Sequence, residues 1–134
     1  MSALVKRYVK ESGSASVSAL LKSERCATSR LSEVEVVSAL VRRGREGAFT
    51  TAQRDRPLAS FRDDLLALVV VELTLEITQQ ACNLLLRHQL RAADAIQLSS
   101  CLYLEHELKE AISFTAFDDK LNLAARGEGL KVIS

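Results

Sequence analysis

Apolar residues recur along the chain at two spacings, and each spacing predicts a different kind of element. Spacings of three and four residues predict helices over 2–10, 14–24, 32–45, 50–66, 77–88, the stretch from Asp94 to about residue 106, and 118–126. Short runs rich in β-branched residues predict strands over 26–29, 69–74, 112–115 and 131–133. The run at 69–74 is nearly continuous, as in a strand buried in a parallel sheet.

Strands and helices alternate through most of the sequence. This alternation predicts a three-layer α/β fold with a parallel sheet. The length of 134 residues fits one domain over 1–134. Pro57 lies too deep for an undisturbed helix beginning at Thr50, so we expect a kink or a restart near Asp55.

The helix over 32–45 carries Val34, Val37, Leu40 and Val41 as its expected apolar stripe. Ser32 and Glu35 have the spacing of a capping box, in which side chains satisfy the first backbone N–H groups. Periodicity does not separate Glu33 from Glu35, so either acid could face a site.

Composition is that of an ordinary soluble globular protein, with 48% hydrophobic and 26% charged residues. The net charge of +1 excludes a global basic footprint, so any nucleic-acid site has to be local. The run Arg42, Arg43 and Arg45 is either a solvated helix face or a contact for a phosphate backbone. The longest apolar run, 65–71, is far shorter than the ~20 residues that span a bilayer. We therefore expect a cytoplasmic protein that does not enter a membrane.

Cys26, Cys82 and Cys101 are odd in number and contain no C-x-x-C pair, which indicates buried small side chains rather than a disulfide framework. His88 and His106 have no partner at zinc-ligand spacing. The sequence also lacks a Gly-rich phosphate loop, a G-x-S-x-G motif and a Walker-type Gly-Lys-Ser/Thr motif.

Three carboxylates share one situation, the start of a helix in an α/β pattern. Glu35 and Asp118 follow predicted strands, and Asp94 lies among alanines in the first turn of its helix. Each acid alone is explained by capping or by the helix dipole, and Thr115 with Asp118 repeats the capping-box spacing. Ligand sites of parallel sheets gather where strands hand over to helices. The alternative is therefore an acidic cluster that binds Mg²⁺ or Mn²⁺, a chemistry suited to phosphodiester hydrolysis.

Four motifs in order resemble the successive motifs of PIN-domain proteins, and in particular the VapC-type toxins of bacterial toxin–antitoxin pairs. They are SALVKRYVKE over 2–11, TSRLSEVE over 28–35, LRAADAIQL over 90–98 and FDDKL over 117–121, with Ala124-Ala125 and Gly129-Leu130 following. The resemblance covers essentially the whole chain.

The resemblance implies a PIN-like α/β/α fold and an Mg²⁺- or Mn²⁺-dependent ribonuclease that is cytoplasmic and commonly homodimeric. It also implies an RNA substrate and neutralisation by a cognate VapB-type antitoxin. Glu35, rather than Glu33, together with Asp94 and Asp118 match the acidic metal-site residues of the family. Ser2 matches the small hydroxyl residue of the first motif, and Ser2, Thr115 and Arg42 are candidates for substrate contact or site support.

The family's first acid is an Asp at the end of the first strand, two residues before the position of Ser2. That position precedes Met1, so we expect this chain to lack the first strand and its acid, as an N-terminally truncated PIN-like domain. Two functions follow as hypotheses. One is a metal-dependent endoribonuclease, and the other is a non-catalytic PIN-like remnant that binds antitoxin or RNA without cleaving.

Overall fold

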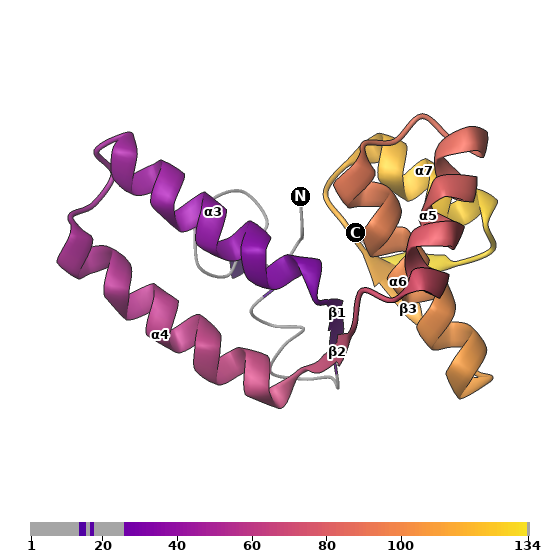
Figure 1. Ribbon diagram of the computed structural model, residues 1–134, viewed down its shortest axis with the longest axis horizontal. Coiled ribbons are helices and arrows are strands. Elements are labelled where there is room, and N and C mark those ends of the chain that lie inside the picture. The colour runs from indigo at the N-terminus through magenta and orange to yellow at the C-terminus, as the bar shows by residue number, and fades with distance from the viewer. Residues whose placement is uncertain (1–13, 16, 18–25, 134) are drawn as a thin grey trace.

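The computed structural model describes residues 14, 15, 17 and 26–133 (Figure 1). The elements along 26–133 are β1 Ala27–Ser29, α3 Leu31–Arg45, α4 Thr51–Ala67, β2 Val69–Val71, α5 Leu75–Arg87, α6 Ala92–Leu108, β3 Ser113–Thr115, α7 Asp119–Gly127 and β4 Lys131–Ile133. The predicted helix over 2–10 lies outside the described residues. Of the predicted helix over 14–24, Ser14, Ala15 and Val17 are described, and they are helical.

The strands pair in parallel, as the alternating pattern predicted. β1 pairs with β2 in the register Ala27 to Val69, and β3 pairs with β4 in the register Ser113 to Lys131. Within the part of the chain that is described, the two pairs form separate two-stranded sheets rather than one continuous sheet. The strand predicted over 69–74 has only three residues, because the chain leaves β2 after Val71 to begin α5. Val69 is exposed, so the strand is not buried along its whole length as its apolar run predicted.

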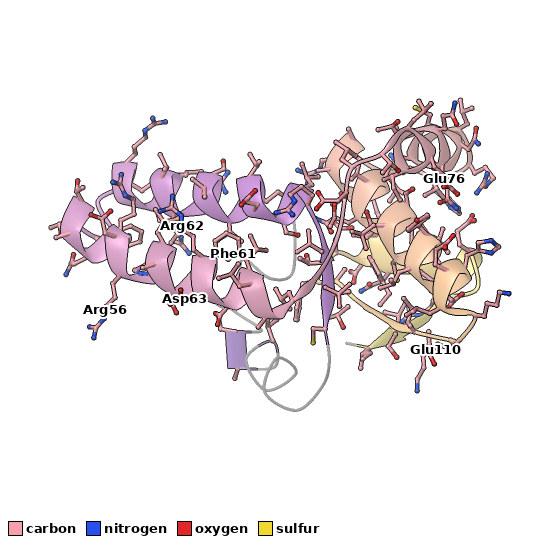
Figure 2. The ribbon with its side chains drawn as sticks, turned by 60° about the horizontal axis from the view of Figure 1, so that its bottom comes forward. Arg56, Phe61, Arg62, Asp63, Glu76 and Glu110 are labelled. Carbon is pink, nitrogen blue, oxygen red and sulfur yellow. The ribbon has the colours of Figure 1, made fainter. Side chains whose placement is uncertain are left out.

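Helices α3 and α4 form an antiparallel arm that extends away from the helices α5, α6 and α7 (Figure 1). The arm has a core of its own, made by Val36, Ala39, Leu40 and Phe61. Phe61 points from α4 toward α3 in Figure 2 and is 1% exposed. The expected stripe of α3 is therefore corrected. Val34 is 65% exposed, because the face that meets α4 is set by Val36, Ala39 and Leu40 at helical spacing.

Helix α4 begins with a true capping box. The Thr50 hydroxyl accepts from the Gln53 backbone N–H at 3.2 Å, and the Gln53 side chain accepts from the Thr50 backbone N–H at 2.8 Å. The helix then continues through Pro57 as one element, so the restart expected near Asp55 is wrong. Two features hold the turns on either side of the proline: the cap at Thr50 and the burial of Phe61.

A second core lies among α5, α6, α7 and the β3–β4 pair, and its largest members include Leu84, Leu98, Phe114 and Leu121. Helix α6 is central, since it contacts β1, α3, α5 and α7. It therefore connects the arm to the second core, and it carries Asp94 in its first turn. No helix in the described part of the chain is long and apolar enough to cross a bilayer.

Candidate functional site

The end of β1 and the start of α3 are fixed by a pair of charged side chains. The Arg30 guanidinium donates to both carboxylate oxygens of Glu72, at 2.8 and 2.6 Å, and the Arg30 backbone N–H donates to the Val71 carbonyl at 2.8 Å. The hydrogen bonds from Arg30 lower the pKa of Glu72. These contacts join the carboxyl ends of β1 and β2 at the point where α3 begins.

Ser32 and Glu35 do not form the predicted capping box. Helix α3 begins at Leu31 with Arg30 as its N-cap, so Ser32 already lies inside the helix, and no side chain caps it at the Arg30 position. The Leu31 backbone N–H donates instead to the Ser29 hydroxyl at 3.1 Å. Ser32 is fully buried, and its Oγ lies 2.6 Å from Oγ1 of Thr28.

Gln97 connects α6 to α3. Its side-chain N–H₂ donates to Oε1 of Glu35 at 2.7 Å and to Oγ of Ser32 at 3.1 Å. One hydrogen-bonded network therefore extends across β1, α3 and α6, and its members are Thr28, Ser32, Gln97 and Glu35. The network orients the Glu35 carboxylate, whereas Glu33 has a long contact of 3.7 Å to Arg30.

Asp94 is a buried carboxylate, only 4% exposed. It lies three residues before Gln97 on α6, and residues at that spacing share a helix face. Since Gln97 contacts Glu35, this face of α6 is the one turned toward α3. Burial of a carboxylate is costly unless hydrogen bonds or charges compensate it, and that cost distinguishes Asp94 from an ordinary first-turn acid in water.

Asp118 is the N-cap of α7, and its Oδ1 accepts from the Leu121 backbone N–H at 3.0 Å. The capping pattern proposed for Thr115 and Asp118 is therefore corrected, because the helix begins at Asp119 and Asp118 itself provides the cap. Oδ2 of Asp118 has no partner among the described residues.

Thr115 ends β3 and is half-buried, and Ser2 lies outside the described residues. Arg42 is exposed in the last turn of α3.

Carboxylate oxygens are the ligands that hard divalent cations prefer, so the donor types of Glu35, Asp94 and Asp118 fit Mg²⁺ or Mn²⁺. Across residues 14, 15, 17 and 26–133, no group of three or more His, Cys, Asp or Glu side chains is arranged to hold a metal ion. Gln97 contacts Glu35 and shares a face of α6 with Asp94. The assignment of all three acids as ligands stays a prediction.

The sequence did not single out Gln97, Ser32 or Thr28 as members of one network. A signal for Gln97 was present, because it follows Asp94 by three residues and must share its helix face. Nothing in the sequence indicated that Ser32 would bond to Thr28 and Gln97 instead of capping α3.

The PIN domain family matches residues 2–127 of the chain. The chain is also similar to two proteins of Mycobacterium tuberculosis. It is 32% identical over 132 residues to "Ribonuclease VapC45" of strain CDC 1551 / Oshkosh and equally to "Ribonuclease VapC49" of strain ATCC 25618 / H37Rv. Each match covers 98% of this chain and 90% of the relative.

The chain therefore belongs to the PIN domain family. The resemblance to VapC-type PIN proteins is confirmed, and so is the three-layer α/β/α fold class that it implied. The described residues match this class through their short parallel strands and the helices around them.

Proposed function

We propose that this protein is a toxin of the VapBC type, an endoribonuclease that hydrolyses RNA phosphodiester bonds with Mg²⁺ or Mn²⁺. The observation that carries the proposal is that Gln97 donates to Glu35 from the face of α6 that carries the buried Asp94, in a PIN-family chain whose relatives are named ribonucleases. The expected partners are an RNA substrate and a VapB-type antitoxin. The expected state is a homodimer in the cytoplasm, away from membranes.

Glu35, Asp94 and Asp118 would hold the cation. A bound cation would supply positive charge beside the scissile phosphate and would make a bound water molecule more acidic. The chain's own contribution is positioning. Asp94 presents a carboxylate from a buried helix turn, and Gln97 and Ser32 fix the orientation of Glu35. Asp118 caps α7 through Oδ1 and keeps Oδ2 available.

A second candidate function is a PIN-like module that binds antitoxin or RNA without cleaving. The finding that favours it is that no group of three potential metal ligands occurs in the described part of the chain. A cation site built from two carboxylates has less negative charge to bind Mg²⁺ than one built from three.

One experiment separates the two functions. The purified chain is incubated with a mixed-sequence single-stranded RNA in EDTA, Mg²⁺ or Mn²⁺, and cleavage is followed alongside isothermal titration with Mn²⁺ alone. A ribonuclease cleaves only with metal and binds Mn²⁺ in a manner lost in Asp94→Asn. A binding module retains RNA without cleavage under all three conditions.

A further inference from the structure

Positive charge is concentrated in one short stretch of an otherwise balanced chain. Residues 42–56 contain five arginines and two acids, which is a formal charge of +3. The whole chain has 18 basic and 17 acidic residues, so the remaining residues carry −2. The five arginines of this stretch, here named the basic tip, are Arg42, Arg43, Arg45, Arg54 and Arg56.

The basic tip is the far end of the α3–α4 arm. It comprises the last turn of α3, the connection over 46–50 and the first turns of α4, and Figure 1 shows this connection at the end of the arm remote from β1 and β2. The connection is ordered by backbone hydrogen bonds, including Ala48 N–H to the Arg43 carbonyl at 3.1 Å. Arg42, Arg45 and Arg56 are exposed, and Arg56 points away from the arm in Figure 2.

Most of this charge is not neutralised locally. Arg54 forms an ion pair with Asp55 at 3.3 Å, whereas the other four arginines form no ion pair within the described residues. Bases in the last turn of α3 are favoured by its helix dipole, which is an ordinary structural reason for three of them. The first turn of α4 contains no acid, and Arg54 and Arg56 add positive charge near its positive end. The pair with Asp55 offsets the charge of Arg54, whereas neither an ion pair within the described residues nor the helix dipole accounts for Arg56.

The chemistry of the basic tip fits a phosphate backbone better than a protein surface. No large hydrophobic side chain is exposed between residues 42 and 56, although ten are exposed elsewhere in the described chain. Protein interfaces are centred on buried apolar or aromatic anchors, which the tip does not offer. Guanidinium groups instead match phosphate oxygens with two parallel hydrogen bonds.

The basic tip also lies in line with the candidate site. Arg42 follows Glu35 by seven residues, two helical turns, so both lie on one face of α3. At 1.5 Å per residue the two positions are separated by about 10 Å along the axis. A single strand whose scissile phosphate lies at Glu35 and Asp94 can continue along this face to the end of the arm.

We propose that the basic tip binds the sugar–phosphate backbone of the RNA beside the cleaved bond, with Arg42, Arg45 and Arg56 as its exposed contacts. The proposal rests on the proposed ribonuclease function for its ligand. Backbone contacts of this kind set the position and affinity of the strand and carry no sequence information. The tip therefore makes binding salt-dependent while the site on α3 and α6 performs the chemistry.

The test uses the full chain with Asp94→Asn, so that RNA remains intact, and a fluorescein-labelled mixed-sequence single-stranded RNA. Anisotropy gives the Kd across about 50–200 mM KCl, a range over which counterion release is measurable. The tip variant is Arg42→Gln, Arg45→Gln and Arg56→Gln together. The matched control is Lys109→Gln, Arg126→Gln and Lys131→Gln, which removes three exposed charges, one each from the C-cap of α6, from α7 and from β4.

The tip variant is expected to weaken binding roughly tenfold or more at low salt and to reduce the slope of log K against log salt by about 2, since each single-strand phosphate contact contributes ~0.7. The control is expected to bind within about twofold of the parent, since counterion release follows only the phosphates that are contacted. Replacing the three tip arginines by lysine should keep most of the affinity, because the charge remains. If the triple glutamine variant is misfolded by circular dichroism, the pair Arg45→Gln and Arg56→Gln gives the same comparison.

The proposal is overturned if the tip and control variants weaken binding equally, if the tip variant keeps the parental slope, or if the parent does not bind RNA. A parallel titration uses fluorescein-labelled poly-glutamate in place of RNA. The proposal is also overturned if the tip variant loses binding to poly-glutamate while it keeps binding to RNA, which would indicate an acidic protein partner. Cleavage by the chain with Asp94 intact is scored separately. RNA binding through the basic tip without any cleavage would contradict the proposed ribonuclease function but not the role of the tip. Cleavage that the tip variants leave unchanged would contradict the role of the tip but not the ribonuclease function.

Discussion

Gln97 donates a hydrogen bond to Oε1 of Glu35 at 2.7 Å, and this contact joins the face of α6 that carries Asp94 to the face of α3 that carries Glu35. The same amide donates to Ser32, which is fully buried. A carboxylate held in this way has one preferred orientation, so Gln97 is a positioning residue for the proposed metal site.

Gln97→Leu is expected to lower RNA cleavage about 10- to 100-fold and to raise the Mg²⁺ concentration needed for half-maximal rate, as loss of an outer hydrogen bond does at metal sites. The measurement is the cleavage rate over a Mg²⁺ titration. Gln79→Leu on the exposed face of α5 is the control and should behave as the parent. An unchanged Mg²⁺ dependence in Gln97→Leu would show that the contact only supports the fold.

Glu35 and Glu33 give a second prediction, because helical periodicity does not choose between them and the choice of Glu35 rests on the family resemblance. Glu35→Gln is expected to reduce cleavage by more than about 10-fold, since a candidate cation ligand loses its charge. Glu33→Gln removes only an exposed 3.7 Å contact to Arg30, worth less than about 1 kcal/mol, and should leave the rate within about twofold. Equal losses in the two variants would refute the choice of Glu35.

Asp94→Asn is expected to reduce metal-dependent cleavage more than about 100-fold while the fold is retained, because the change is nearly isosteric and removes one negative ligand. Asp119→Asn is the matched control, since Asp119 is also a first-turn acid but is exposed on α7. Cleavage rate and thermal midpoint are measured together. Normal cleavage by Asp94→Asn would mean that this buried acid acts only at the helix end.

The positions of most elements could be predicted from periodicity, because amphipathic helices such as α5 and β-branched strands such as β2 leave a local pattern. Capping could not be predicted reliably. The capping-box spacing occurs at Ser32 and at Thr115, where the structure does not use it, and also at Thr50 with Gln53, where it does. Three-residue spacings are common, and tertiary contacts decide which of them begin a helix.

The candidate site shows the same limit. Asp94 could be found from sequence as an acid among small residues, but its burial depends on α6 lying between the arm and the second core. The bond between Gln97 and Glu35 joins residues 62 positions apart, and no local pattern predicts such a contact. The continuation of α4 through Pro57 as one helix is likewise accompanied by a tertiary contact, the packing of Phe61 against α3.

The cysteines give a prediction that does not depend on function. They are not uniformly buried as expected: Cys82 is exposed, while Cys26 and Cys101 are half-buried. Burial, with a smaller effect of Glu105, raises the pKa of Cys101 from 9.0 to about 12. At pH 8 its thiolate fraction is therefore roughly a thousandfold below that of an ordinary thiol. Iodoacetamide labelling followed by peptide mass spectrometry should modify Cys82 well before Cys101. Faster labelling of Cys101 would contradict the described packing of α6.

The last prediction concerns Glu128, whose carboxylate joins the end of α5 to the turn after α7. Oε2 of Glu128 lies 2.6 Å from Nε2 of His88, and Oε1 accepts from Arg87 at 2.9 Å. The hydrogen bonds from His88 and then Arg87 lower the pKa of Glu128 below its ordinary 4.5. A carboxyl group with a lowered folded-state pKa stabilises the protein above the unfolded-state pKa, and this stability is lost as pH falls toward the folded-state value.

Glu128→Gln is therefore expected to lower stability near neutral pH by about 1 kcal/mol, because the group is near the surface and partly screened. The difference from the parent should shrink as the pH falls below 4.5. Urea unfolding of both chains between about pH 3 and 7 measures it, over the range in which a carboxyl group titrates. Glu110→Gln, an exposed acid just after α6, is the control and should show no such pH-dependent difference. A Glu128→Gln difference that stays constant with pH would assign its effect to packing rather than to charge.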